Sequence, residues 1–281
     1  LLQSFSNMED KSMLPRVDLV RADENDWLLL KSPDHINNFV RENGYWGATD
    51  AGIAKVFLAN RSNANVIDVG ANIGGFTVPI ARYLSATNGK LHAFEPQRIV
   101  FQQLCANIFL NRLDNVFTYN WALGDTNKGI KIPELDFWNS QNVGKFSVDE
   151  HIRSCLANEA LVESLAVNME IHTDATVDQR TLDSLNFEFP VNFIKVDIEG
   201  YELEFFEGSA HTIERNSFPP IIFEVWEKAW YAEKAEQTKS ILASWGYDFH
   251  YFGREILAQH HLHSVQCNVT EKDGQAYLSV S

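Results

Sequence analysis

The feature that most constrains the fold is the segment of residues 65–82, NVIDVGANIGGFTVPIAR. It predicts a buried strand over 66–69, then a glycine-rich turn, then a helix with an apolar face. Glycines let the backbone pass close to a ligand, and the free N–H groups at a helix N-terminus bind negative charge. The segment therefore predicts an α/β domain with a nucleotide-like ligand at the carboxyl end of this strand, the alternative being a βα turn without a ligand.

The spacing within the turn excludes two common nucleotide sites. No Lys-Ser/Thr pair follows Gly75, as a phosphate-binding P-loop requires. Ala71 and Asn72 follow Gly70, so the second glycine of a dinucleotide fingerprint, which admits the pyrophosphate, is missing. The pattern D-x-G-A-N-x-G instead resembles the first motif of S-adenosylmethionine (SAM)-dependent methyltransferases. Asp68, at the strand tip, suits a ligand that carries an ammonium and a sulfonium.

A second acidic residue follows at the tip of the next predicted strand. Residues 90–94, KLHAF, end in Glu95-Pro96, and Pro96 stops the strand because it has no N–H. An acid at the tip of the second strand of a βαβ unit is placed to accept hydrogen bonds from both ribose hydroxyls. The alternative is an exposed glutamate at a strand end.

Length and charge narrow the class of protein. The 281 residues fit one large α/β domain with appendages. The 38 acidic and 23 basic residues give a net charge of −15, which disfavours nucleic acid as the principal partner because phosphates are repelled. We therefore expect a small-molecule or glycan acceptor.

Cysteine usage and hydropathy suggest the compartment. The three cysteines, Cys105, Cys155 and Cys267, form no C-x-x-C pair and are typical of a reducing compartment, so a cytoplasmic protein is expected. No apolar run approaches 18 residues, so no membrane span is predicted. Asp197 and Glu199 supply only two carboxylates, and His260-His261-x-His263 lies in predicted strand and loop positions. No metal site is assigned.

The first half of the chain divides into an arm and the start of the main domain. Residues 1–62 are interpreted as an N-terminal arm with lid helices, and residues 63–281 as the main domain. Residues 126–175 are interpreted as an insertion over the carboxyl edge of the sheet, where substrates are usually selected. The predicted elements of this half are helices over 34–41, 49–59, 98–111 and 150–165, and strands over 116–121, 130–132, 144–148 and 167–172.

The second half continues as alternating strands and helices. This alternation calls for a parallel sheet covered on both faces. The predicted elements are strands over 191–197, 220–225, 247–252 and 276–280, and helices over 201–215 and 232–245.

Taken together, these motifs resemble the FkbM family of SAM-dependent methyltransferases. The resemblance covers roughly residues 44–227 and rests on VIDVGANIGGF, FEP, ALGD, TLDSL and above all FIKVDIEGYE. It implies a Rossmann-like class I methyltransferase fold, with a seven-stranded, mostly parallel sheet whose last strand is antiparallel and with helices on both faces. It also implies that SAM donates a methyl group to a hydroxyl of a sugar, glycan or small natural product, leaving S-adenosylhomocysteine (SAH).

The resemblance also implies the cofactor-binding residues. By position, the methionine end would be held by Asp68, Gly70, Asn72 and Gly74, the ribose by Glu95, and the adenine by Ala122 and Asp125. From sequence alone, Asp125 is equally well interpreted as a plain turn acid.

Methyl transfer to an alcohol predicts a base beside the reacting oxygen, because an alcohol is a poor nucleophile at neutral pH. Asp197 is the first candidate, since it ends the strand next to the switch point. Glu199 is the second, as a base or as a residue that fixes sugar hydroxyls, and Lys195 is placed to tune either. Alternatively, Glu199 favours the N-terminus of the following helix.

Two other functions are compatible with these motifs. One is a SAM-binding module without catalysis, which the intact set of acidic residues disfavours. The other is ribose methylation of RNA, which the net charge of −15 disfavours.

Overall fold

The computed structural model describes residues 16–22, 24–135, 144, 146–162, 171–272 and 275–280. Its centre is a seven-stranded sheet in the spatial order β11-β12-β10-β9-β3-β4-β5. Within this sheet only β12 runs against the other six strands. The strands are β3 (Asn65–Val69), β4 (Lys90–Phe94), β5 (Val116–Tyr119), β9 (Phe193–Val196), β10 (Ile221–Glu224), β11 (Tyr247–Phe252) and β12 (Glu255–His260).

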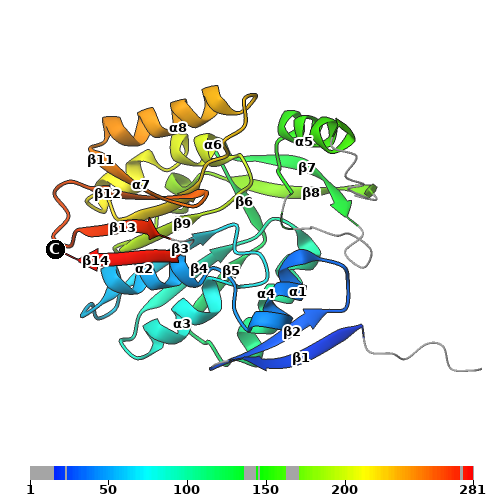
Figure 1. Ribbon diagram of the computed structural model, residues 1–281, viewed down its shortest axis with the longest axis horizontal. Helices are drawn as coiled ribbons and strands as arrows, with labels where there is room; N and C mark the ends of the chain where they lie inside the picture. The colour runs from blue at the N-terminus through cyan, green and yellow to red at the C-terminus, as the bar shows by residue number, and fades with distance from the viewer. Residues whose placement is uncertain are drawn as a thin grey trace, which may run out of the picture.

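Helices cover both faces of the sheet (Figure 1), as predicted. One face carries α2 (Ala48–Leu58), α3 (Thr77–Ser85) and α4 (Arg98–Leu110), and the other carries α6 (Glu202–Glu207), α7 (Ala210–Arg215) and α8 (Ala232–Ser244). Each set packs its apolar residues on one side of the sheet, which gives two hydrophobic cores.

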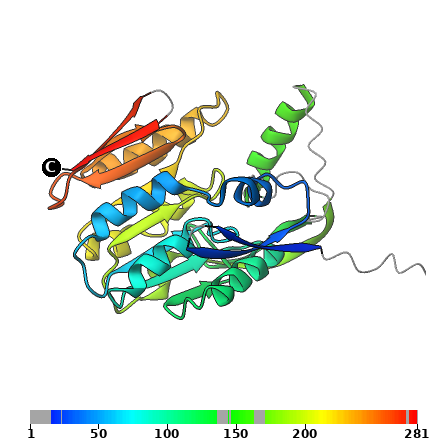
Figure 2. The same cartoon turned by 60° about the horizontal axis from the view of Figure 1, so that its bottom comes forward.

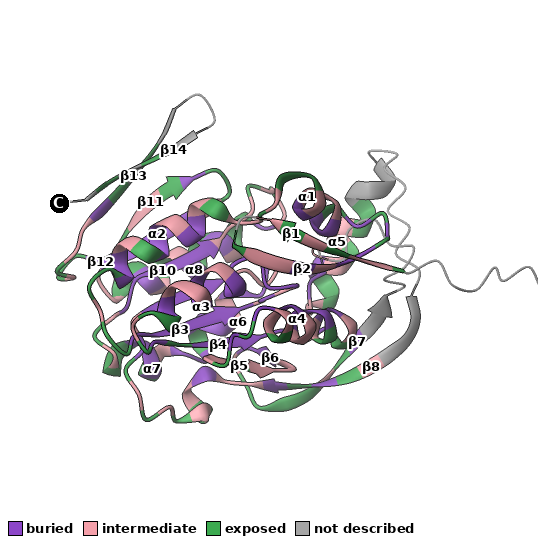
Figure 3. Ribbon diagram, turned by 90° about the horizontal axis from the view of Figure 1, so that it is seen from below, coloured by how far each residue is buried: buried purple, intermediate pink, exposed green. Residues whose placement is uncertain are grey.

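Side-chain alternation along the strands assigns residues to these two cores. Val66 packs in the core under α2 and α3, whereas Ile67 packs in the core under α6 to α8. The central strands are buried on both faces (Figure 3). Asp68 pairs with Lys195 on the neighbouring strand β9, so two buried charged residues face the α2 side together.

The N-terminal arm contains strands that the sequence analysis did not predict. A hairpin of β1 (Val17–Ala22) and β2 (Asn25–Leu30) precedes α1 (His35–Asn43). Asn107 of α4 accepts a hydrogen bond from the backbone N–H of Leu28, so the hairpin is fixed to the main domain. The helix α1 begins as predicted, with the Asp34 side chain accepting from the backbone N–H of Asn37.

The region around the predicted insertion over 126–175 contains a second, three-stranded sheet and one helix, and this sheet begins before the insertion and ends after it. It consists of β6 (Trp121–Leu123), β7 (Lys128–Leu135) and β8 (Ile171–Arg180), with α5 (Glu150–Val162) between β7 and β8. The predicted strand over 116–121 was wrong in extent: it breaks at Asn120, whose amide donates to the backbone oxygens of Glu95 and Pro96. The predicted strand over 144–148 was also wrong, since its described residues form a turn and coil. Residues 163–170, part of the predicted helix over 150–165 and strand over 167–172, lie outside the described residues.

Two further predictions needed correction in the second half of the chain. The single helix predicted over 201–215 is divided into α6 and α7, because Gly208 lies against Gly124 so closely that a Cβ atom would come within 2.0 Å of the Gly124 oxygen. The antiparallel strand is β12, which was missed, rather than the strand predicted over 276–280. That last segment is β14 (Gln275–Val280), which pairs with β13 (Cys267–Lys272) in a separate hairpin.

The added segments lie around the central sheet. Figure 2 shows α5 and the β13–β14 hairpin at opposite ends of the molecule. Among the described residues, none of the helices combines the length and apolar character that crossing a membrane requires.

The contact between β3 and β9 at Gly70 gives a stability prediction. Gly70 has φ 80°, and a Cβ atom there would lie 1.8 Å from the backbone oxygen of Asp197. We expect Gly70→Ala to lower the free energy of unfolding by about 3 kcal/mol or more, because both chain segments must shift. Denaturant titration followed by circular dichroism measures this change.

A control variant at Gly253 separates the effect of steric overlap at Gly70 from the effect of a left-handed backbone. Gly253 also has a positive φ, 62°, but no atom lies within 4 Å of its missing Cβ. Gly253→Ala should cost only about 1 to 2 kcal/mol, the strain of a left-handed residue. Equal losses in the two variants would show that the close approach at Gly70 has no energetic weight.

Candidate functional site

A cavity of about 940 Å³, counted to its open mouth, lies where β3, β4 and β9 end. From β3 the chain adds β4 and then β5 on one side, and it later returns to add β9 and β10 on the other side of β3. The strand order therefore reverses between β3 and β9, and α/β folds bind ligands at such a switch point. Four segments far apart in sequence line it: the N-terminal arm, the glycine turn, the insertion and the turn after β9. The lining includes Ile36, Trp46, Asp50, Gly70, Asn72, Gly75, Phe76, Glu95, Gln97, Trp121, Ala122, Phe146, Val148, Lys195, Asp197, Glu199 and Tyr201.

The glycine turn is held open by its own backbone. The N–H groups of Gly70 and Ala71 both donate to the Phe94 oxygen, at 2.9 Å. Asn72 adopts φ 50°, and its side chain accepts from the backbone N–H of Ile73 at 2.8 Å. Trp46 of the arm packs on Gly75, where a Cβ atom would lie 2.9 Å from the indole ring. The arm therefore closes directly over the turn.

Glu95 is a buried carboxylate in the wall of the cavity. Its side chain is 3% exposed, and its two oxygens accept from the backbone N–H groups of Asn72 and Gln97, both at 2.9 Å. Burial raises the pKa of Glu95 to about 7, although these two N–H groups act to lower it. Each carboxylate oxygen retains a further lone pair, so the group can accept from a diol.

Three residues predicted to contact the cofactor do not line the cavity. Asp68 is fully buried, with one oxygen accepting from the Thr77 hydroxyl at 2.5 Å and the other without a hydrogen-bond partner among the described residues. Gly74 is next to the lining Gly75. Asp125 accepts from the Gln179 amide at 3.0 Å and lies 3.8 Å from Lys128. Their contact with a ligand stays a prediction.

The other predicted residues are brought together at the cavity. They are Gly70, Asn72, Glu95, Ala122, Lys195, Asp197 and Glu199. Sequence reasoning missed the tryptophans and the acid that complete the wall, Trp46, Trp121 and Asp50. The two tryptophans could have been found by their positions, because Trp46 lies shortly before the helix predicted over 49–59 and Trp121 ends the strand predicted over 116–121.

Lys195 is the buried cation of the site. It is 6% exposed, and its Nζ lies 3.1 Å from Oδ2 of Asp197. Burial acts to lower the pKa of Lys195, but the carboxylates around it, first Asp197 and then Asp68 and Asp50, raise the pKa above its usual value. The neighbouring carboxylates thus favour the charged ammonium, which contacts the Asp197 carboxylate at the end of β9.

Glu199 reaches the same place by an unusual backbone conformation. The strand β9 ends at Val196, so alternation along the strand does not align Glu199 with Asp197. Instead Glu199 has φ 54° and Gly200 has φ 93°. Ligand atoms of Asp197, Glu199 and Glu224 then lie within 4.8 Å of one another.

These three carboxylates have the chemistry to hold a divalent cation. The ammonium of Lys195, however, is already 3.1 Å from the Asp197 carboxylate, and a fixed positive charge there opposes a second cation. The geometry therefore favours Lys195 as the counter-charge of this group.

The residues present fit a nucleoside that carries a positive charge. The carboxylate of Glu95, placed just after β4, can accept from a diol, the acidic residues Asp197 and Glu199 line the same cavity, and the turn lacks the glycine that a pyrophosphate needs. The seven-stranded sheet with one antiparallel strand and helices on both faces defines a class I methyltransferase fold. The sequence model of the FkbM methyltransferase domain matches residues 68–249, well over half of the chain. The protein therefore belongs to the FkbM methyltransferase family, as the sequence motifs predicted.

Solved structures resemble the chain at low sequence identity. An FkbM methyltransferase from Methylobacillus flagellatus KT is 18% identical with a TM-score of 0.46, over 72% of this chain and 45% of that one. Trm5b from Pyrococcus abyssi is 14% identical with a TM-score of 0.41, over 86% and 55% of the two chains. An O-methyltransferase from Bacillus cereus, solved in complex with SAH, is 13% identical with a TM-score of 0.43, over 76% and 81%. The chain thus spans about half the length of the first two structures, and no match was found among curated proteins.

The raised pKa of Glu95 predicts how stability depends on pH. Below pH 4.5, the ordinary pKa of a glutamate, the Glu95 carboxyl is protonated in both the folded and unfolded chains, and its contribution to stability is fully present. Between 4.5 and about 7 the unfolded chain releases the proton more readily, so stability falls as pH rises, by on the order of 3 kcal/mol in all. Unfolding free energies measured by denaturant titration from pH 4.5 to 8 test this.

The Glu95→Gln variant is the control for this pH dependence. Glutamine has no proton to release between pH 4.5 and 7. The loss of unfolding free energy over this range should therefore be smaller than in the wild type by on the order of 3 kcal/mol, whatever the absolute stability of the variant. A slope identical to that of the wild type would contradict the assignment of a raised pKa to Glu95.

Proposed function

We propose that the protein is a SAM-dependent O-methyltransferase that methylates a hydroxyl of a sugar, glycan or small natural product. The observation that carries this proposal is the arrangement of one cavity. The glycine turn and Glu95 line one part of it, and Asp197, Glu199 and Lys195 line another. The residues that we propose bind the methyl donor and the candidate bases thus line one cavity.

The cofactor end of the cavity is assigned from the groups available there. Glu95 would accept from the ribose hydroxyls, and Gly70 and Asn72 would lie along the methionine end. Ala122 and Trp121 would flank the adenine, with Asp68, Gly74 and Asp125 as predicted supporting residues. SAM, when bound, supplies a methyl group activated by its sulfonium.

The chain's own residues orient the acceptor and take its proton. The Lys195 ammonium contacts Oδ2 of Asp197, and we assign proton acceptance from the acceptor hydroxyl to Oδ1. Glu199 is the alternative base, or a hydrogen-bond acceptor for a neighbouring hydroxyl. Trp46 from the arm and Phe146 from the insertion exclude water from this end.

The charge of the acceptor end supports a neutral acceptor. Asp50, Asp197 and Glu199 line the cavity with a single buried cation, Lys195. An anionic acceptor such as an RNA backbone would be repelled, and a polyol would find several acceptors for its hydroxyl protons.

The Glu95 assignment predicts a loss of cofactor affinity. Glu95→Ala removes the carboxylate that we propose accepts from both ribose hydroxyls, so the affinity for SAH should fall by about 10-fold or more. Isothermal titration calorimetry measures it, with Glu188→Ala at an exposed position as the control. Unchanged affinity would refute the ribose assignment, and a wild-type protein that binds neither SAM nor SAH would refute the proposed function.

The base assignment predicts a loss of turnover without a loss of cofactor binding. Asp197→Asn preserves the shape of the side chain but cannot take a proton, so kcat should fall by about 100-fold or more while SAH affinity changes by less than about 3-fold. Transfer of a labelled methyl group from SAM to a panel of glycans and small alcohols measures it.

Chelation provides the control for this reading of the carboxylates. If Asp197 acts as a base, treatment of the wild type with EDTA should leave methyl transfer unchanged. Loss of activity with EDTA, restored by Mg²⁺, would instead make Asp197, Glu199 and Glu224 a metal site. Cofactor binding without methyl transfer to any acceptor would favour a non-catalytic SAM-binding module.

A further inference from the structure

A buried glutamate outside the cavity holds the turn that carries the candidate bases. Glu202 is 1% exposed and follows the turn at the start of α6. Its Oε1 accepts from the backbone N–H groups of Ile198 and Gly200, both at 3.2 Å. These two N–H groups stand immediately before and after Glu199, so one carboxylate oxygen clamps both sides of that residue.

Glu199, the residue between these two N–H groups, has a left-handed backbone conformation that is unfavourable for any residue with a Cβ atom. Glu199 has φ 54° and Gly200 has φ 93°, two left-handed residues in succession. A non-glycine residue in this region persists only where surrounding contacts impose it, and such residues cluster at functional sites. The contacts here include the two hydrogen bonds to Glu202 and the packing of Ile152 on Gly200, where a Cβ atom would lie 2.7 Å from Cδ1 of Ile152.

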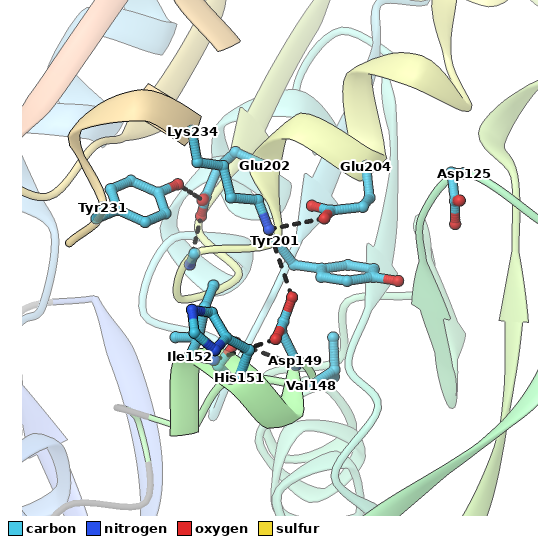
Figure 4. Close-up of polar contacts among 12 residues, drawn as sticks. Asp125, Val148, Asp149, His151, Ile152, Tyr201, Glu202, Glu204, Tyr231 and Lys234 are labelled. Atoms are coloured by element: carbon cyan, nitrogen blue, oxygen red, sulfur yellow. Dashed lines mark hydrogen bonds and ion pairs between the residues drawn. The ribbon is translucent and has the colours of Figure 1, made fainter. Parts of the chain in front are cut away.

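A second buried side chain fixes the glutamate in turn. The hydroxyl of Tyr231 donates to Oε2 of Glu202 at 2.9 Å, and Tyr231 is 1% exposed at the start of α8. Figure 4 shows Tyr231 and Glu202 joined in this way, with the turn on the other side of the carboxylate. Both Glu202 oxygens are therefore engaged, one by the turn and one by α8.

The neighbouring glutamate on the same helix has a different task. Glu204 pairs with Lys234 at 2.7 Å, and Lys234 also lies 3.6 Å from Asp149 at the start of α5 (Figure 4). This ion-paired group ties the insertion to α6 and α8. Two glutamates on one short helix thus separate the anchoring of the turn from the anchoring of the insertion.

We propose that Glu202 is a positioning residue for methyl transfer, which with Tyr231 holds Glu199 in its left-handed conformation and so keeps the Glu199 and Asp197 carboxylates together at the acceptor end of the cavity. The proposal rests on the proposed function for its catalytic consequence, but not for its structural one. Glu202 touches neither the cavity nor the cofactor-binding turn, so it acts through the backbone of Ile198 and Gly200.

Amide exchange tests the structural part without any acceptor. In Glu202→Ala the amides of Ile198 and Gly200 lose their acceptor, so hydrogen–deuterium exchange at these two sites should be about 10-fold faster. Tyr231→Phe removes only the outer hydrogen bond and should give a smaller acceleration at the same sites, which keeps the test available if Glu202→Ala does not fold. Glu204→Gln, the matched control on the same helix, should leave both amides at the wild-type rate.

Steady-state kinetics test the catalytic part. With active sites counted by SAH binding, kcat per site should fall by about 10-fold or more in Glu202→Ala, whereas KM for SAM should stay within about 2-fold. A role in global stability alone would reduce the number of sites but not kcat per site. Glu202→Gln keeps a carbonyl oxygen for the two amides and should restore most of the amide protection and of kcat.

Two results would overturn the proposal. Exchange at Ile198 and Gly200 that is unchanged in Glu202→Ala would show that the clamp does not hold the turn. Faster exchange with unchanged kcat per site would show that the position of Glu199 does not matter for transfer. If the wild type binds SAH but methylates no acceptor, the proposed function fails, and the amide exchange still decides whether Glu202 positions the turn.

Discussion

The site depends on the placement of one buried ammonium among carboxylates. Lys195 on β9 lies opposite Asp68 on β3 in the strand register, and its Nζ lies 3.1 Å from Oδ2 of Asp197. The negative charges of these two acids and of Asp50 stabilise the protonated form of Lys195. Burying several carboxylates at one sheet edge costs free energy unless a cation compensates them. The parallel pairing of β3 with β9 brings that cation to the edge, and so the acidic wall of the cavity becomes compatible with a folded protein.

The same strand pairing joins the two halves of the site. Gly70 lies so close to the Asp197 backbone that no side chain fits between them. The glycine turn after β3 and the acidic turn after β9 therefore form one packed unit. Two further segments complete it: Trp46 of the N-terminal arm packs on the glycine turn, and Ile152 of α5 packs on Gly200 of the acidic turn.

Several parts of the architecture were predictable because they are local. The glycine turn, the strand ending at Glu95 and the start of α1 at Asp34 each follow from residues close together in sequence, and the structure confirmed them. Other parts were not predictable because their causes are distant. The break between α6 and α7 comes from Gly124, and the break after β5 comes from Asn120 reaching the backbone of Glu95 and Pro96. The antiparallel strand β12 was missed because residues 255–260 carry only a weak strand pattern.

The sequence by itself determined the class of fold and the family, because the motifs that define them are short, continuous segments located at the ends of strands. It also named Asp197, Glu199 and Lys195 as a group. Only the tertiary structure decided that Glu224 and Asp50 join them, that Asp68 and Asp125 lie outside the cavity wall, and that Glu202 holds the turn. The physical reason is that these relations arise between neighbouring strands and helices, whose register and packing bring together residues that are far apart along the chain.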